Sequence, residues 1–368
     1  MATQHLDPSD PMAGPVTADA LAAYLRAQAT EFLRALRAGR ETGDGGPPSR
    51  GGPAARTKPR VGERPRAGEN GSEESADAAL ALRRSARRIS GTLHTYRPLL
   101  DADWTESMRP ELAWLSGTLG REHAYAARLD RLVTALNRLS GASSFAGQST
   151  GAASSAGDAA KGNLTVGAAK AGALLERQLT LARTRAHSAA LQALGSSRFH
   201  AVADSVAVLA SEVPLAPAAA TADLRPLASA AHERLCDAVS GLPLITAGHP
   251  YNAEALIHGL SPDPAPHPQD APWHQVRLLL RLHRYAREVL HGTDAPVDVR
   301  LLTAGEALNR HRDASEAAAA AAAAARTPRI APATAYALGV LHADQRHEVE
   351  AARFGFQQAW QRETVSTR

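Results

Sequence analysis

Arginines recur along two stretches of the chain at the spacing of a helical face. The first stretch contains Arg83, Arg84, Arg87, Arg88, His94 and Arg97, and the second contains His274, Arg277, Arg281 and Arg284. At about 100° per residue, four of the first set share an arc of about 80°, namely Arg83, Arg87, His94 and Arg97. The second set shares an arc of similar width, about 80°. Each helix is therefore expected to bury one face and present a column of cations beside it.

Such columns favour a polyanionic ligand. Like charges one helical turn apart destabilise an isolated helix by about 0.2–0.5 kcal/mol per pair, so a bound anion accounts for their repetition. A guanidinium group also binds two phosphate oxygens at once. The alternative is a solvated arginine face without a ligand. Two columns in equivalent positions favour the ligand.

The composition limits which classes of protein fit. The chain has 368 residues and a net charge of only +4, so anion binding has to come from local clustering of charge. Cys236 is the single cysteine, which excludes an intramolecular disulfide. The N-terminal residues are polar, and no stretch approaches the roughly 20 apolar residues that cross a membrane. We therefore expect a cytoplasmic protein that does not enter a membrane.

Apolar residues at helical spacing must position these cations. They predict helices near residues 17–38, 77–99, 103–140, 166–194, 198–211, 222–240, 270–291, 297–325 and 332–362. We expect Asp103 or Thr105 to cap the third helix. Residues 39–76 read as a disordered insertion and residues 141–165 as a flexible linker. No alternating strand pattern competes, so the predicted fold class is all-α.

Two motifs resemble those of a known family. The stretch from Leu82 to Leu100 resembles the first motif of the CHAD domain, the conserved histidine α-helical domain, and Trp273 to Ala286 resembles the second. Weaker similarity surrounds Arg198 and the segment from Asn309 to Asp313, which includes Arg310. The resemblance implies two facing helical bundles related by internal duplication, at residues 16–212 and 221–364.

The resemblance also implies a function. Members of the family bind inorganic polyphosphate in a basic channel between the bundles, which would place Arg198 and Arg310 with the two columns. The Glu-x-Glu-x-Lys pattern of the triphosphatase domain fused to some relatives is absent from this chain. We therefore expect polyphosphate binding without catalysis, without a cofactor or metal, and with targeting to polyphosphate granules. His311, Arg312 and Asp313 are expected to line the same channel from a helix surface.

Departures from the family pattern keep alternatives open. Leu80 stands where the first motif has its histidine, and Leu278 and Leu282 replace basic residues of the second. The chain is then a helical scaffold for another anion, such as nucleic acid, or for no polyanion. Nucleic acid is disfavoured because exposed aromatic residues do not interleave with the arginines. An enzyme acting on phosphoanhydrides is a further alternative, but it needs clustered metal-binding carboxylates. The sequence does not specify the oligomeric state.

Overall fold

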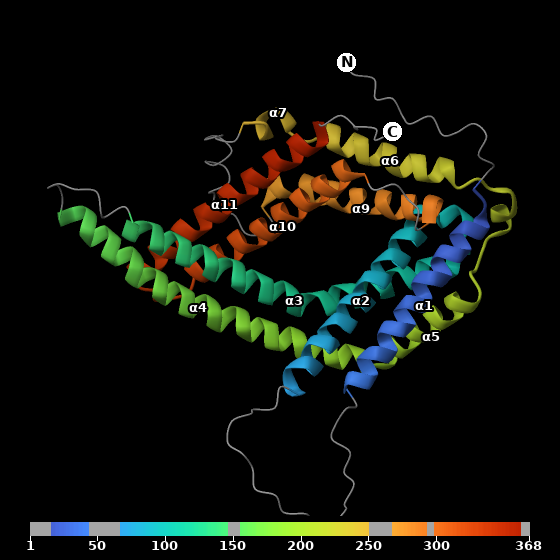
Figure 1. Cartoon of the computed structure of the whole chain (residues 1–368), viewed down its shortest axis with the longest axis horizontal. Helices are drawn as coiled ribbons and strands as arrows, with labels where there is room; N and C mark the ends of the chain where they lie inside the picture. Colours follow the sequence, from blue (N-terminus) through green and yellow to red (C-terminus); the bar gives the residue numbers. More distant parts are fainter. Residues whose placement is uncertain (1–15, 44–66, 146–154, 250–266, 293–297, 362–368) are drawn as a thin grey trace, which may run out of the picture. The chain divides into compact units, whose positions relative to one another are not determined.

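The computed structural model describes residues 16–43, 67–145, 155–249, 267–292 and 298–361 (Figure 1). These residues form helices and connecting turns and contain no strand; an isolated bridge joins Leu100 to Leu215. The α-helices are α1 (Ala18–Gly43), α2 (Ala67–Thr95), α3 (Ala102–Phe145), α4 (Ser155–Leu194), α5 (Ser197–Ser211), α6 (Arg225–Ser240), α7 (Leu244–Ala247), α9 (Ala271–His291), α10 (Val299–Ala325) and α11 (Pro332–Gln361). The described residues also form the 3-10 turns η1 (Arg97–Leu99), η3 (Pro217–Thr221) and η4 (Pro268–Asp270). The predicted all-α fold class is confirmed.

Short polar side chains begin several helices. Ser196 accepts a hydrogen bond from the backbone N–H of Phe199 at the start of α5, and Asp298 accepts one from Leu301 at the start of α10. At the start of α3 the cap is Asp101, whose carboxylate accepts a bond of 2.8 Å from the N–H of Trp104. The expected caps, Asp103 and Thr105, lie inside this helix. Each cap satisfies a backbone donor that the first helical turn leaves unpaired.

The two segments predicted to be irregular are shorter than expected. Helix α1 continues to Gly43 and α2 already begins at Ala67, so both ends of the predicted 39–76 insertion are helical. Likewise α3 runs to Phe145 and α4 starts at Ser155, inside the predicted 141–165 linker. Alanine and glutamate are strong helix formers and extend these helices despite the glycines nearby. Residues 44–66 and 146–154 lie outside the described residues.

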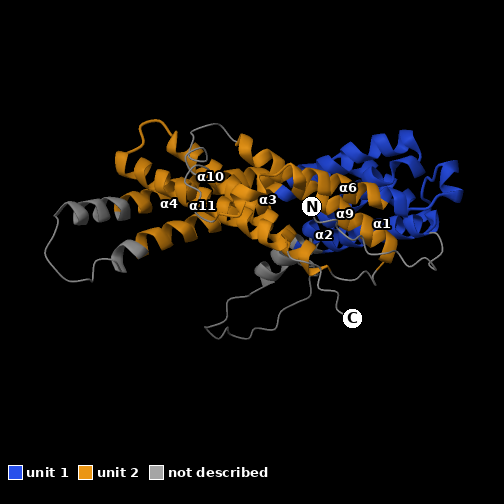
Figure 2. Cartoon of the chain, turned by 90° about the horizontal axis from the view of Figure 1, so that it is seen from above, with its two compact units in different colours: residues 1–120, 189–227 blue, residues 121–188, 228–368 orange. Residues whose placement is uncertain are grey.

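The helices group into two compact units, each built from two segments of the chain (Figure 2). Unit 1 comprises residues 1–120 and 189–227, and unit 2 comprises residues 121–188 and 228–368. Residues 121–188 thus belong to unit 2, although they precede the boundary expected between residues 212 and 221. This assignment has a physical basis, because the second half of α3 and most of α4 bury their leucines against α10 and α11.

Unit 1 is built around α1, which packs against both α2 and α5. Its fully buried side chains include Phe32 of α1, Ile89 and Leu93 of α2, and Phe199 of α5. These apolar positions recur every three to four residues, which is why each helix turns one face inward. The basic column of α2 lies beside this buried face.

Helices α10 and α11 contribute to two hydrophobic cores among the described residues of unit 2. In the first, Ala317, Ala321 and Ala324 of α10 meet leucines of α3, α4 and α11. The second surrounds Trp273 of α9 and Phe356 of α11. The run of nine alanines from Ala317 to Ala325 favours a helix by its composition alone. In the structure it is also a packing face, because its small side chains let α10 and α11 lie side by side.

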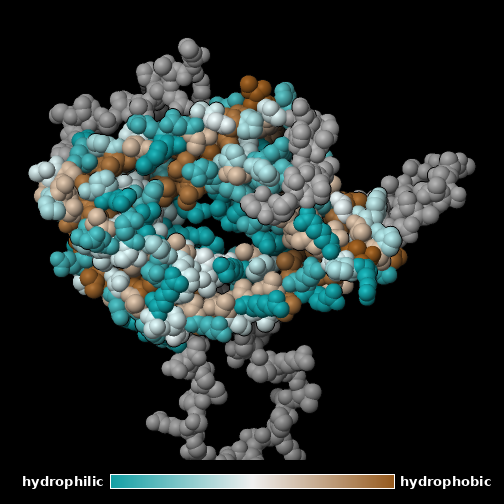
Figure 3. Space-filling view, turned by 180° about the vertical axis from the view of Figure 1, so that it is seen from behind, coloured by the Kyte–Doolittle hydropathy of each residue, from teal (hydrophilic) through white to brown (hydrophobic). Residues whose placement is uncertain are grey.

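Exposed large apolar residues are dispersed over several helices, among them Val166, Ile245 and Val299. On the face drawn in Figure 3, hydrophobic residues form small separate patches between hydrophilic ones. Among the described residues, no helix combines the length and the apolar character needed to cross a membrane.

Candidate anion-binding site

The basic column of unit 2 lies on α9. Pro272 stands in the first turn of this helix, where its missing N–H costs no hydrogen bond. The helix ends at Gly292, whose φ of 61° suits a glycine. Between these ends, Trp273 and Val276 are buried, while Arg277 is partly accessible and Arg284 is exposed. The alternation of buried and accessible positions sets the column along one side of the helix.

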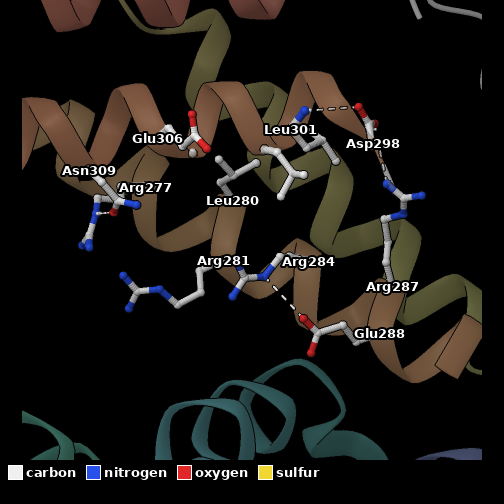
Figure 4. A pocket seen from close by; sticks show the side chains of 12 residues that line it. Arg277, Leu280, Arg281, Arg284, Arg287, Glu288, Asp298, Leu301, Glu306 and Asn309 are labelled. Atoms are coloured by element: carbon white, nitrogen blue, oxygen red, sulfur yellow. Dashed lines mark hydrogen bonds and ion pairs between the residues drawn. The ribbon is translucent and has the colours of Figure 1, made fainter. Parts of the chain in front are cut away.

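The column lines a pocket of about 320 Å³ formed by α9 and the first half of α10 (Figure 4). The residues that line it are Arg277, Leu280, Arg281, Arg284, Arg287, Glu288, Asp298, Leu301, Leu302, Gly305, Glu306 and Asn309. The structure thus brings together three of the predicted site residues, Arg277, Arg281 and Arg284. Helix α10 contributes Glu306 and Asn309 to the pocket, and not the expected Arg310.

Arg281 is the residue of the column whose charge most needs a bound anion. Its guanidinium is half-buried, and among the described residues no carboxylate forms an ion pair with it. Burial lowers the pKa of Arg281, and the nearby charges of Arg284 and Arg312 lower it further. An arginine nevertheless stays protonated in proteins. A buried, uncompensated cation is costly unless an anion binds to it.

The neighbours of Arg281 are held by hydrogen bonds and ion pairs. Arg277 donates from Nε to the side-chain oxygen of Asn309 at 2.8 Å. Arg284 lies 3.4 Å from Glu288, one turn further along the helix. At the end of the pocket, Nη1 of Arg287 lies 3.6 Å from the Asp298 carboxylate. These contacts orient the guanidinium groups but neutralise part of the charge.

His274 differs from the cation expected at the start of the column. Its ring is partly buried, and its Nε2 is enclosed without a hydrogen-bond partner among the described residues. Burial is the main cause that lowers the pKa of His274 below its ordinary value of 6.5. At neutral pH the ring is therefore uncharged, and it can serve a phosphate only as a hydrogen-bond donor. It contacts the ring of His311 edge to face at a centroid distance of 5.5 Å.

His311 was expected on a helix surface, but the structure buries it. It is 1% exposed and stacks on Trp273 at 5.6 Å, because its position on α10 faces the interior shared by α9 and α11. Burial lowers the pKa of His311 to about 3. Its neighbour Arg312 is partly accessible and pairs with Asp313 on the same helix. Only part of the expected triplet is thus available to a ligand.

Beneath the start of α9 lies a buried ionic cluster that the sequence pattern did not reveal. Asp270 accepts hydrogen bonds from Arg346 at 2.8 Å, from Arg353 at 2.7 Å and from the hydroxyl of Ser315. Burial opposes ionisation of Asp270, but the hydrogen bond and charge of Arg346 prevail and hold its pKa at about 2. The cluster ties the first turn of α9 to α10 and α11, and so positions the arginine column.

The column of unit 1 lies on α2. Arg83 is partly buried and donates from Nε to the backbone carbonyl of Ser116 on α3 at 3.2 Å. Its guanidinium passes directly over Gly120, where an added Cβ would overlap it. Arg84 is exposed, and Arg87 and Arg88 are partly accessible on the same helix.

Arg97 was expected on the same helical face but lies beyond the helix. Helix α2 ends at Thr95, and Arg97 begins the 3-10 turn η1. Pro98 disfavours helical backbone at the residue before it, which explains the break. Arg97 instead pairs with Glu106 of α3 at 3.0 Å. The helical arc predicted for the first motif is therefore wrong at this residue.

Acidic and basic residues of α3 contact the predicted site of unit 1. The Nδ1 atom of His94 lies 3.0 Å from Nη2 of Arg109. Arg198 of α5 forms a two-pronged ion pair with Glu111, at 2.6 and 3.0 Å, and its guanidinium lies over the ring of Trp114 at 4.1 Å. The hydrogen bond from Arg198 lowers the pKa of Glu111. Sequence reasoning missed Glu111, although its position one helical turn from Trp114 was a usable signal.

Arg310 does not join the other arginines of unit 2. It is exposed and does not line the pocket. An added Cβ at Gly355 of α11 would lie 3.6 Å from Nη2 of Arg310, so this side chain extends over α11. Its neighbour Asn309 takes the place beside Arg277. Within the described ranges, no three His, Cys, Asp or Glu side chains are grouped to hold a metal ion.

A family model described as the CHAD domain matches residues 66–322, which include both basic columns. The chain belongs to the CHAD domain family. The matched part of this CHAD chain extends from the start of α2 almost to the end of α10. The structure of PptA from Streptomyces chartreusis is also similar, with 66% identity over 95% of this chain and 100% of that chain, and a TM-score of 0.73. Comparison with curated proteins gave no match.

Proposed function

We propose that this CHAD protein binds inorganic polyphosphate without hydrolysing it, through the basic columns of α2 and α9. The single observation that carries the proposal is Arg281, a half-buried guanidinium with cationic neighbours and no carboxylate partner in the described structure. Membership of the family supports the same ligand. A cytoplasmic localisation and recruitment to polyphosphate granules are further parts of the proposal.

The chemistry of polyphosphate fits these residues. Each internal phosphate carries about one negative charge, and arginines that displace its counterions gain affinity that falls steeply with salt, by analogy with nucleic acids. The planar guanidinium also bridges oxygens of neighbouring phosphates. Arg83 and Arg84 of α2, with Arg87 and Arg88, would bind one part of the chain. Arg277, Arg281 and Arg284 would bind another, with His274 as a neutral donor.

The decisive experiment compares two pairs of charge reversals. The test variant carries Arg83→Glu and Arg281→Glu. The control variant carries Arg26→Glu and Arg185→Glu, which change the net charge equally at exposed positions outside both columns. Retention on immobilised long-chain polyphosphate should be lost in the test variant and kept in the control. Equal loss in the two variants would show that binding depends on net charge alone and would reject the assignment.

Two further measurements separate this function from the alternatives. Polyphosphate should displace a bound oligonucleotide at much lower phosphate concentration than the oligonucleotide displaces polyphosphate; the reverse order would identify a nucleic-acid-binding protein. Incubation of polyphosphate with the protein and magnesium or manganese should release no phosphate. Release at a rate that follows protein concentration would identify an enzyme.

A further inference from the structure

The pocket between α9 and α10 contains an apolar floor that inorganic polyphosphate does not use. Leu280 and Leu301 form this floor, and Leu302, which also lines the pocket, is 46% exposed. Phosphate oxygens are strongly hydrated and gain nothing from apolar surface. A ligand that covers these leucines gains the free energy of removing them from water. The floor therefore fits a ligand with both an anionic and an apolar part.

Carboxylates line part of the pocket as well as arginines. In Figure 4, Arg281 and Arg284 extend from α9 along one side, while Glu306 and Asp298 come from α10. Glu306 is exposed, and among the described residues it has no ion-pair partner. A linear polyanion that filled the whole pocket would meet these carboxylates at a cost. An anion confined to Arg277 and Arg281 would avoid them, and it would also avoid Glu288, which pairs with Arg284.

We propose that this pocket binds a nucleoside triphosphate, with its phosphates on Arg277 and Arg281 and its nucleoside over the leucine floor. Glu306 then accepts a hydrogen bond from an amino group of the base or a hydroxyl of the ribose. A pocket of about 320 Å³ is at the small end of ligand sites. It suits a nucleoside with the phosphates at its rim. This inference goes beyond the proposed function and shares with it only the phosphate-binding arginines.

Calorimetric titration of the full chain tests the proposal, with ATP, inorganic tripolyphosphate and adenosine as probes and no divalent cation. Tripolyphosphate carries at least as much charge as ATP but lacks the apolar part. ATP should bind about tenfold more tightly than tripolyphosphate, a ratio within reach of one buried apolar group. Adenosine should bind far more weakly than ATP, because it lacks the phosphates. Equal or tighter binding of tripolyphosphate overturns the proposal.

Two leucine variants locate the effect. Leu302→Ser removes apolar area from the pocket edge and should lower ATP affinity about threefold to tenfold, with tripolyphosphate affinity unchanged. Leu278→Ser is the matched control, because Leu278 is 45% exposed on α9 but does not line the pocket. It should leave both affinities unchanged. Equal loss of ATP affinity in the two variants places the nucleoside elsewhere and overturns the proposal.

Failure of this inference is distinguishable from failure of polyphosphate binding. Long-chain polyphosphate retention is measured on the same proteins. If retention persists and the preference for ATP is absent, only the nucleotide proposal fails. If the preference for ATP is present and retention is absent, the proposed function fails and the pocket assignment stands.

Discussion

The guanidinium of Arg346 lies 2.8 Å from the carboxylate of Asp270, and neither residue is more than 2% exposed. Asp270 immediately precedes α9, whereas Arg346 lies in the middle of α11. Arg353, about two turns further along α11, binds the other carboxylate oxygen. Since α9 carries the candidate anion site, this buried contact connects the stability of unit 2 with the placement of its arginines.

Replacing Arg346 should lower the stability of the protein, because the Asp270 carboxylate then stays buried with less compensating charge. Arg346→Met leaves Asp270 with fewer compensating charges and should lower the free energy of unfolding by about 3–5 kcal/mol. Urea denaturation measures the change. The control is Arg138→Met, because Arg138 is 55% exposed in its ion pair with Asp344 at 2.7 Å, and its loss should cost less than about 1 kcal/mol. Similar losses in the two variants would contradict a structural role for the cluster.

Two buried histidines should make the protein less stable in mild acid. Burial is the main cause that lowers the pKa of His283 to about 4 and that of His311 to about 3. The unfolded chain, with ordinary values near 6.5, binds more protons in this range, so stability falls as pH decreases from about 6.5 towards 3. Asp270 adds a further loss as pH falls from about 3.8 towards 2, since its folded pKa is about 2.

Denaturation midpoints measured between pH 7 and pH 4 check this dependence. His283→Gln should flatten the decline, whatever its effect on stability at pH 7. His200→Gln is the control, because His200 is exposed on α5 and should leave the slope unchanged. An unaltered slope in His283→Gln would show that the titrating group lies elsewhere.

The close approach of Arg83 to α3 predicts a separation of binding from stability. Gly120→Ala places a Cβ where the Arg83 guanidinium lies, so this flexible side chain has to move. Alanine favours the helix by up to about 1 kcal/mol, and stability should therefore stay equal or rise while polyphosphate affinity falls. Gly117→Ala is the control, since nothing lies within 4 Å of its added Cβ. If both variants bind polyphosphate alike, Arg83 is not part of the site.

The ion pair between Arg198 and Glu111 predicts a gain of function. Glu111→Gln removes the charge that competes with an anionic ligand, so polyphosphate affinity should rise by about threefold to tenfold. Titration at low salt measures it. Glu122→Gln is the control in unit 2, where Glu122 pairs with Arg183 and His187. An unchanged affinity in Glu111→Gln would remove Arg198 from the list of binding residues.

The sequence was sufficient to locate the helices because their apolar residues recur at an unambiguous period. Thus α5 begins and ends within one residue of its expected limits, and α9 does the same. The predicted first residues of α2 and α4 were wrong, and the reason is physical. Glycine and serine near Ala67 and Ser155 resemble a linker in composition, whereas the alanines and glutamates among them sustain a helix.

The site was predictable only in part. The spacing of Arg277, Arg281 and Arg284 along one helix set them on one face, and the pocket confirms that they lie together. Contacts between distant residues left no such signal. Asp270 and Arg346 are 76 positions apart, and a buried charge has the same place in a helical pattern as a solvated one. Internal duplication of the two units remains a prediction.

Helix α10 contributes both to the pocket and to a hydrophobic core of unit 2. Near its start, Leu301 and Gly305 line the pocket, and near its finish Ala317, Ala321 and Ala324 are fully buried in a core with α3, α4 and α11. A continuous helix of 27 residues spans about 40 Å and moves as one rod. A larger side chain at Ala321 would press on the helices packed against it and force the backbone of α10 to shift. Residues far from the pocket, with no polar chemistry of their own, would then affect where Leu301 and Gly305 lie.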